Sequence, residues 1–575
     1  MYSQKLVYNN IKIFNIIGGL FVKLISIIVS VYNKEKFLEK CIQSIIDLKI
    51  DKSIIEAIFV DDVSTDNSYK IIKEYAEEYD FIRCIKLSEN TGGPAEPRNV
   101  GIQEANGEYL TILDADDWLE SDGIPKLVYQ MRDNDSDIGF GQCYKHRNNE
   151  IVKVANFTSY KEDNGLVPYE INKIFRSIGP WAKIFKRSTV FDHNIKFKNL
   201  KYAEDKLFYC EIISKSKSAS MTSENVYHVN RYTNNISLVK KTNVMEKAEY
   251  NLEVLKEIVK MSLPKIATQQ ILCRIIEMDF ISRFFLTKTF LNSNNKEYFY
   301  HIFDEVESIV TNLGFEMNRI IENARYKNVY YAYHYNKEDF VEFVDHALNR
   351  ANKQKYINNH IVHFKYPKKF NNLNEIKSKC TAVYNGTRLI NNKFYKVIEV
   401  FRQPEVKINF VKLVKKEDER YSKNLDFILD NNFIYVEARY FEFEDYDFNI
   451  LIQFNDYETT LVNSIYPDSS KNYKLKSQNH KLELLKSNKK NKKKKANKYL
   501  KVVPKFVVLI KDSNIYRDLE FKEKISPIYK GRVFEIVSID KSTKNVPRLV
   551  TKEGYYISAN LDIVLSLDFD NLVLQ

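Results

Sequence analysis

The chain of 575 residues is poor in glycine, proline and cysteine, and it has no long apolar run. Because no stretch of about 18 uninterrupted apolar residues occurs, we expect no membrane-spanning helix. With only 15 Gly and 44% apolar residues, the chain is neither fibrous nor generally disordered. The six Cys form no CxxC pair and have no His partner at zinc spacing, so we expect reduced thiols and no zinc site.

The first 23 residues are a leader whose apolar core, Ile13 to Val22, is too short to span a bilayer. No small-residue cleavage site follows it, so we do not expect a secretory signal peptide. The sequence predicts a cytoplasmic protein, with peripheral contact at the inner face of the cell membrane as an open alternative. The net charge of +12 favours anionic partners, namely a polyol phosphate chain, nucleic acid or an acidic membrane.

The stretch TILDADDWL, from Thr111 to Leu119, carries the strongest chemical signal. An apolar run ends there on Asp114, Asp116 and Asp117, which predicts a buried strand followed by three carboxylates. Alternate residues of an extended segment point the same way, so Asp114 and Asp116 can face one ligand together. Such a pair suits a hard divalent cation that in turn holds a diphosphate, and the alternative is a solvated acidic turn.

Three segments around this stretch, residues 24–46, 54–79 and 87–117, each combine an apolar strand with a helical or loop pattern. This alternation predicts a parallel, doubly wound sheet whose ligands lie at the carboxyl ends of the strands. The polar residues at those ends are Ser30, Tyr32, Asp61, Asp62, Asn90, Asn99, Asp114 and Asp116.

Five motifs together resemble the inverting GT-A glycosyltransferases of family 2. In order along residues 24–245, they are SVYN, VDDVSTD, GGPAEPRNVGI, LDADDW and KYAEDKLF. The segments NTGGPAEPRNVGI, GPWAKIFKRS and YAEDKLFYCEIISKSK are also similar to the staphylococcal wall teichoic acid N-acetylglucosaminyltransferases, which act on poly(ribitol phosphate). The resemblance implies a Rossmann-like GT-A catalytic domain.

The resemblance also implies site roles for individual residues. The donor, a UDP-sugar, would contact Ser30, Tyr32, Asp62, Asn90, Arg98, Asp114 and Arg231. Of these, Tyr32 and Asp62 would hold the uracil, and Asp114 with Asp116 would meet the ribose and a Mn²⁺ or Mg²⁺ ion. Ser30 stands where relatives have Pro, which weakens any side-chain role there. Arg98 could instead pair with a local carboxylate.

The pair Glu204 and Asp205 precedes an amphipathic run and is therefore expected at a helix start, where an ionised carboxylate is stabilised. The resemblance assigns Asp205 as the general base, with Glu204 orienting acceptor or metal. His228 is a candidate third metal ligand, although a hydrogen-bonded structural His is the commoner case. Trp181 would face donor or acceptor sugar, or belong to the core.

Length and pattern changes divide the chain into several domains. We expect a leader at 1–23, a GT-A domain at 24–243, a helical linker domain at 244–354, a β-sandwich-like domain at 355–485, a Lys-rich linker at 486–501 and an SH3-like domain at 502–575. The last segment resembles SH3-like repeats of Gram-positive surface proteins and would hold polymer or oligomerise the chain. The Lys-rich linker is a solvated segment or a patch for phosphate polymer or anionic lipid.

The expected function is transfer of a sugar, N-acetylglucosamine first, from a UDP donor to a polyol-phosphate teichoic acid chain with a β linkage. Alternatives are a capsule or other surface-glycan transferase, a different UDP-sugar, or a wall-polymer binding protein without turnover. Nucleic acid is not an expected partner, because no recognised nucleic-acid motif accompanies the lysines. The resemblance further suggests a homo-oligomer, with a trimer as the first candidate.

Overall fold

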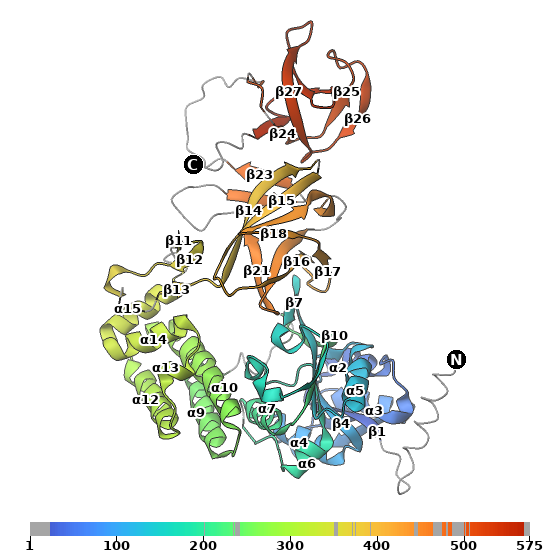
Figure 1. Cartoon of the computed structure of the whole chain (residues 1–575). Helices are drawn as coiled ribbons and strands as arrows, with labels where there is room; N and C mark the ends of the chain where they lie inside the picture. Colours follow the sequence, from blue (N-terminus) through green and yellow to red (C-terminus); the bar gives the residue numbers. More distant parts are fainter. Residues whose placement is uncertain are drawn as a thin grey trace.

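The computed structural model describes residues 23–567, apart from 201, 234, 236–241, 350–354, 371, 374, 392, 442–446, 464–473, 479–480, 486–498, 501 and 505. Figure 1 shows an α/β part in blue to teal, a helical region in green beside it, and two β-rich parts in yellow to red. This arrangement confirms the predicted multidomain architecture. The leader and nearly all of the Lys-rich linker lie outside the described residues.

One sheet organises the α/β part, with the strand order β3-β2-β1-β4-β9-β6-β10-β5. Its strands are β1 (Lys23–Val31), β2 (Ile55–Asp61), β3 (Ile82–Lys86), β4 (Gly107–Asp114), β5 (Trp118–Leu119), β6 (Ile138–Arg147), β9 (Lys183–Lys186) and β10 (Ala219–Asn230), with β7 (Glu150–Val154) and β8 (Asp163–Leu166) at its margins. The first four strands are parallel, as predicted. β9 runs antiparallel to β4.

Helices cover both faces of this sheet (Figure 1). They are α2 (Glu35–Ile46), α3 (Ser68–Glu78), α4 (Ala95–Glu104), α5 (Gly123–Asp133), α6 (Arg187–Asp192) and α7 (Glu204–Lys215). β2 is buried along its whole length and β1 along most of it, which explains their uninterrupted apolar sequences. The two faces of the sheet contribute to two separate apolar clusters.

The helical region shares one of those clusters with the sheet. Leu110 and Ile112 of β4, Phe208 of α7, and Leu255 and Phe280 of the helical region all belong to the same apolar cluster. The region comprises α9 (Val244–Lys260), α10 (Lys265–Arg274), the π-helix η5 (Ile275–Phe285), α11 (Lys288–Asn292), α12 (Lys296–Asn312), α13 (Met317–Ile320), α14 (Ala324–Tyr335) and α15 (Lys337–Leu348). It is therefore packed as a continuation of the α/β part.

The pattern from Ala267 to Leu291 predicts one α-helix, and the structure differs there. The segment is α-helical as far as Arg274, continues as the π-helix η5 and ends in the short helix α11. Apolar and acidic side chains are buried together in η5, and a π-turn aligns residues five apart instead of four. Sequence periodicity does not report such a change of pitch.

The remaining chain is β-rich, as predicted. One sheet has the order β17-β16-β20-β21-β14-β15-β19-β18, a second joins β11, β12 and β13, and a hairpin joins β22 and β23. The last seven strands form a sheet in the order β26-β25-β29-β28-β27-β24-β30. The bounds are β11 (Lys355–Asn358), β12 (Ile361–Phe364), β13 (Ile376–Lys377), β14 (Cys380–Ile390), β15 (Lys393–Arg402), β16 (Ile408–Lys415), β17 (Ser422–Leu425), β18 (Ile428–Asp430), β19 (Phe433–Glu437), β20 (Phe448–Phe454), β21 (Glu458–Asn463), β22 (Lys474–Gln478), β23 (Lys481–Leu485), β24 (Phe506–Leu509), β25 (Ser513–Tyr516), β26 (Lys524–Ile528), β27 (Val533–Lys541), β28 (Pro547–Thr551), β29 (Tyr556–Ser558) and β30 (Val564–Leu567).

Two smaller predictions are also answered by the described residues. None of their helices is both long and apolar enough to cross a bilayer. All six cysteines are free thiols, and five of them are buried. Burial raises the pKa of Cys84, the most accessible of them, to about 11, so its thiol stays protonated at neutral pH.

Candidate functional site

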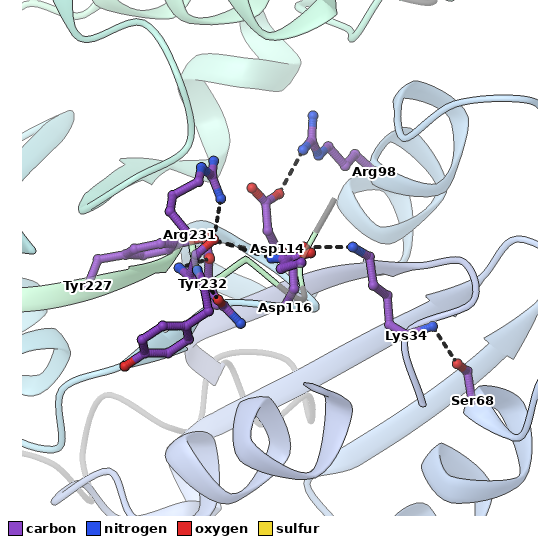
Figure 2. Close-up of polar contacts among 11 residues, drawn as sticks. Lys34, Ser68, Arg98, Asp114, Asp116, Tyr227, Arg231 and Tyr232 are labelled. Carbon is purple, nitrogen blue, oxygen red and sulfur yellow. Dashed lines mark hydrogen bonds and ion pairs between the residues drawn. The ribbon is translucent and has the colours of Figure 1, made fainter. Parts of the chain in front are cut away.

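Three carboxylates meet where β4 ends. Asp114, Asp116 and Asp117 each offer an oxygen atom, and these oxygens lie within 4.8 Å of one another. Figure 2 shows that two of the carboxylates already have cationic partners. Arg98 Nη2 donates to Asp114 Oδ1 at 2.9 Å, and Lys34 Nζ donates to Asp116 Oδ2 at 2.6 Å. The predicted facing pair, Asp114 and Asp116, is therefore brought together at the carboxyl edge of the sheet.

Asp117 is the buried member of the group and is held by the chain itself. Its carboxylate accepts hydrogen bonds from the Tyr227 hydroxyl at 2.9 Å and from the Asn230 N–H at 2.7 Å. The Tyr227 oxygen also accepts from the Asp114 N–H at 3.1 Å. Burial, with Asp114 and Asp116 nearby, raises the pKa of Asp117 well above its usual range. This residue fixes the end of β4.

The chemistry of this group fits a hard divalent cation. Three carboxylates within a few ångströms repel one another, and oxygen ligands are those that Mg²⁺ and Mn²⁺ take. Lys34 and the Asn235 amide, 2.9 Å away, both bind the same oxygen of Asp116, which offsets part of that repulsion. Asp116 and Asp114 are the accessible members that could hold a cation, whereas the Asp117 oxygens are directed to internal donors.

The second acidic pair starts α7. Ala203, just before the helix, adopts a left-handed φ of 71°, and Glu204 and Asp205 form the first turn. Burial and the neighbouring Asp205 charge raise the pKa of Glu204 to about 7. Burial also raises the pKa of Asp205, while Arg98, Lys206 and Arg274 pull it down. Asp205 as a whole residue is partly exposed.

Arg98 connects the two acidic groups. Its guanidinium donates to Glu204 Oε1 at 2.8 Å and to Asp114 Oδ1 at 2.9 Å, and it lies 5.2 Å from the centre of the Phe197 ring. Only 5% of the residue is exposed. The sequence left open whether Arg98 pairs with a carboxylate. It does so in the structure, although one partner, Glu204, is 106 residues away in the chain. A nucleotide contact by Arg98 stays a prediction.

The predicted nucleotide-binding residues lie along the same edge. Asp62 Oδ1 accepts from the Thr91 N–H at 2.8 Å, and Asn90 Nδ2 donates to the Asp62 carbonyl at 2.7 Å. These bonds tie the loop after β3 to the end of β2. Ser30 pairs in register with Asp114, and Tyr32, one residue beyond β1, is 47% exposed. The four predicted residues Ser30, Tyr32, Asp62 and Asn90 are thus brought together. Their contacts with a nucleotide stay predictions.

Arg231 and His228 come from the end of β10 and have different surroundings. The Arg231 guanidinium lies 5.5 Å from the centre of the Trp181 ring. His228 engages both ring nitrogens, with His146 at 2.8 Å and Glu120 at 3.1 Å, and it stacks on Trp118. It lies outside the carboxylate group of the candidate metal site. The hydrogen-bonded structural interpretation of His228 therefore agrees with the structure.

Sequence reasoning missed two lysines at the site. Lys34 lies three residues beyond β1, so the same strand-end rule that selected its neighbours could have selected it. Lys183 is buried and donates to the carbonyls of Gly179 and Trp181 at 2.8 and 3.2 Å. It thereby fixes the loop that approaches Asp205, and burial lowers its pKa to about 7. No local signal in the sequence marks Lys183.

Comparisons with known proteins agree with this geometry. The family model described as Glycosyl transferase family 2 matches residues 26–183, and a model described only as a domain of unknown function, DUF5776, matches residues 499–564. The SH3-like interpretation of the last segment thus stays a prediction.

Among curated relatives, a poly(ribitol-phosphate) beta-glucosyltransferase of Bacillus spizizenii is 33% identical over 36% of this chain and 32% of its own length. The poly(ribitol-phosphate) beta-N-acetylglucosaminyltransferase TarS of Staphylococcus aureus strain Mu50 is 29% identical over 35% of each chain. For the poly(ribitol-phosphate) beta-N-acetylglucosaminyltransferase TarP of S. aureus strain N315, the identity is 31% over 42% of this chain and 74% of the relative.

The chain thus matches about a third of the length of the first two relatives and three quarters of the third. A crystal structure of S. aureus TarS aligns over 93% of this chain and all of that one, with a TM-score of 0.52 and 17% identity, and so supports the fold alone. Taken with the five motifs and the paired acidic groups at the sheet edge, these matches show that the chain belongs to glycosyl transferase family 2.

Proposed function

We propose that the chain is an inverting glycosyltransferase that moves a sugar from a UDP donor to a hydroxyl of a polyol-phosphate teichoic acid chain. One observation carries the proposal: Arg98 joins the Asp114 group at the end of β4 to the Glu204–Asp205 pair at the start of α7. In this proposal one buried guanidinium would connect the site of a cation-bound diphosphate with the site of the base.

The donor would lie along the carboxyl edge of the sheet. Tyr32 and Asp62 would bind the uracil, with Ser30 and Asn90 beside them. Asp116 and Asp114 would hold a Mn²⁺ or Mg²⁺ ion, which supplies positive charge to the departing diphosphate when bound. Arg231, mounted over Trp181, would donate to the same diphosphate.

Asp205 would act as the general base. It takes the proton of the acceptor hydroxyl while that oxygen forms a bond to the anomeric carbon, and the bond from this carbon to the diphosphate oxygen breaks with its electron pair leaving on UDP. One displacement inverts the anomeric centre, so an α-linked donor gives a β-linked product. Glu204, protonated or held by Arg98, would orient the acceptor.

The acceptor class rests on the curated relatives, three of which are named as poly(ribitol-phosphate) transferases. Two of them transfer N-acetylglucosamine and one transfers glucose, so UDP-N-acetylglucosamine is our first donor and UDP-glucose the second. The chain's net charge of +12 suits a polyanionic acceptor.

The test is release of UDP from a panel of UDP-sugars with Mn²⁺, with and without poly(ribitol phosphate). We expect acceptor-stimulated release that is lost in Asp205→Asn, an isosteric change that removes the base. UDP binding should persist in that variant, because Asp205 lies on the acceptor side. Release without stimulation by the acceptor would refute the teichoic acid assignment, and stimulated release by Asp205→Asn would refute the base.

Two alternatives use the same assay. A capsule or other surface-glycan transferase would be stimulated by another acceptor and not by poly(ribitol phosphate). A wall-polymer binding protein without turnover would retain the polymer but release no UDP. We favour turnover because both acidic groups are intact and connected.

We further propose the domain boundaries given above, a homo-oligomer, and peripheral membrane contact through the leader and the Lys-rich linker. Light scattering tests the oligomer, with a trimer expected and a monomer refuting it. Sedimentation with anionic vesicles tests the membrane contact. Binding that persists without residues 1–23 and 486–501 would refute the role of those segments.

A further inference from the structure

A buried charge cluster lies behind the first turn of α7. Lys206, the residue after the proposed base, donates to Asp279 Oδ2 at 2.9 Å and to Asn251 Oδ1. Arg274 donates to the same Asp279 oxygen. Each of the four residues is at most 6% exposed. We call these four the Lys206 cluster; three of them belong to the helical region and one to the α/β part.

The pitch of the π-helix η5 allows the Arg274 side chain to contact the Asp279 carboxylate. The two residues are five positions apart, with Arg274 at the end of α10 and Asp279 within η5. In an α-helix such residues point about 140° apart, since each residue turns the helix by roughly 100°. A π-helix bonds residues five apart and so places them on one side. The unusual pitch therefore has a local consequence, namely a buried ion pair directed at α7.

A contribution to folding stability does not by itself explain why this cluster is made of buried charges. Buried ion pairs often contribute no more than apolar residues of the same size, because each charge must leave water. Here Arg274 Nε and Asp279 Oδ1 also lack a hydrogen bond, although Arg283 Nη1 lies 3.5 Å from the latter. Two buried cations share one buried anion, and the surplus positive charge lies next to Asp205. Burial raises the pKa of Asp205, while Arg98, Lys206 and Arg274 oppose that rise.

We propose that the Arg274–Asp279 pair is a positioning device for the proposed base: it fixes Lys206, and with it the turn of α7 that carries Asp205. The inference rests on the proposed function and makes the helical region a part of the active site. In this role Arg274 and Asp279 would not touch substrate; they would act through Lys206 and through the shared apolar core.

The same π-helix offers a matched control. Glu277, two residues before Asp279, is fully buried and pairs with Arg176 of the α/β part. It also accepts the N–H groups of Glu322 and Asn323 at 2.8 Å each. Glu277 thus fastens the same two parts of the chain, but it is not among the largest influences on the pKa of Asp205.

The experiment compares Asp279→Asn, Arg274→Met and Arg274→Lys with Glu277→Gln in the full chain. We expect Asp279→Asn and Arg274→Met to lower kcat by roughly 10- to 100-fold, with KM for the UDP-sugar within about twofold, because a displaced base affects the chemical step and not donor binding. Arg274→Lys should recover most of the loss. Glu277→Gln should lower the Tm but keep kcat within about twofold of wild type.

The pH dependence of kcat distinguishes a positioning role from a merely structural one, because a merely structural role would not shift it. Asp205 has charged or titratable neighbours on every adjoining element, namely Arg98, Asp114, Lys183, Tyr202, Glu204, Lys206, Tyr209, Cys210 and Arg274. Removing the Arg274 charge weakens one of the forces that keep Asp205 ionised. The acidic limb of kcat should therefore move to higher pH in Arg274→Met and return toward wild type in Arg274→Lys.

Hydrogen exchange of the amides in residues 203–210 decides the positioning independently of turnover. We expect faster exchange there in Asp279→Asn than in Glu277→Gln. Equal losses of kcat and equal exchange in these two variants would overturn the inference and leave the cluster as an interface fastener. A wild-type protein that releases no UDP would instead refute the proposed function. If Asp279→Asn or Glu277→Gln fails to fold, the comparison of Arg274→Met with Arg274→Lys decides the inference.

Discussion

The buried guanidinium of Arg98 allows the sharpest test of the site, through Arg98→Met. Methionine keeps most of the side-chain volume but removes the charge and both hydrogen bonds, at 2.8 and 2.9 Å. Removing one member of a buried ionic group costs about 3 to 5 kcal/mol, because the remaining charge loses its compensation. We expect the lower end of that range, because Asp114 keeps some contact with water and Glu204 can take up a proton.

The loss should depend on pH with a defined sign. In the wild type the pKa of Glu204 is about 7, above the usual 4.5, so this group's contribution favours folding most below pH 4.5 and declines up to pH 7. Without Arg98 the folded-state pKa rises further, and the decline continues above pH 7. The variant should therefore be destabilised by about 3 kcal/mol at pH 8 and clearly less at pH 6.

Thermal unfolding at pH 6 and pH 8 measures this difference. For a unit of 150–250 residues, about 3 kcal/mol corresponds to a Tm lower by roughly 6–12 °C. Because the chain has several parts, the transition to follow is the one that UDP binding shifts. A decrease under about 2 °C at pH 8, or the same decrease at both pH values, would refute the idea that Arg98 neutralises buried Glu204.

Three further substitutions test neighbouring parts of the site. Lys34→Met should tighten Mn²⁺ binding by roughly fivefold, measured by calorimetry, because the ammonium no longer competes for the Asp116 carboxylate. The control is Lys36→Met in the first turn of α2, which removes an exposed lysine and should leave Mn²⁺ binding unchanged. Tyr227→Phe should cost about 1–3 kcal/mol of stability in urea unfolding, since a buried carboxylate loses its 2.9 Å donor; an unchanged midpoint would contradict this. Gly123→Ala should prevent folding or lower the Tm strongly, because the added Cβ would lie 1.8 Å from a β10 carbonyl oxygen. Gly93→Ala is the control and should be tolerated, because the atom nearest to its added Cβ is 3.9 Å away.

The sequence predicted those parts of the site that lie next to a strand in the chain. Apolar runs located β1, β2 and β4 but not β3, and the polar residues at or just beyond the ends of the located strands include Asp62 and Asp114. The rule works because a parallel sheet brings the carboxyl ends of its strands to one edge, whatever the loops do. Lys34 obeys the same rule, although it was not among the polar residues predicted there.

Pairings between distant residues could not be predicted in this way. Arg98 meets Glu204 across 106 positions, and Asn235 meets Asp116 across 119. Each such contact depends on how helices and loops pack on the sheet, which periodicity does not encode. The antiparallel β9 and the π-helix η5 escaped for the same reason, since both are set by tertiary packing and not by local pattern.

The boundary between the α/β part and the helical region shows why this distinction matters for function. The hydrophobic period changes near residue 244, and a sequence-based division there follows from that change. In the structure the apolar cluster runs from β4 through α7 into α9 and η5 without a break. Arg274, one of the cations that act on Asp205, comes from the far side of that boundary. A change in sequence pattern marks a change of secondary structure, but the extent of a functional site follows the core on which it is built.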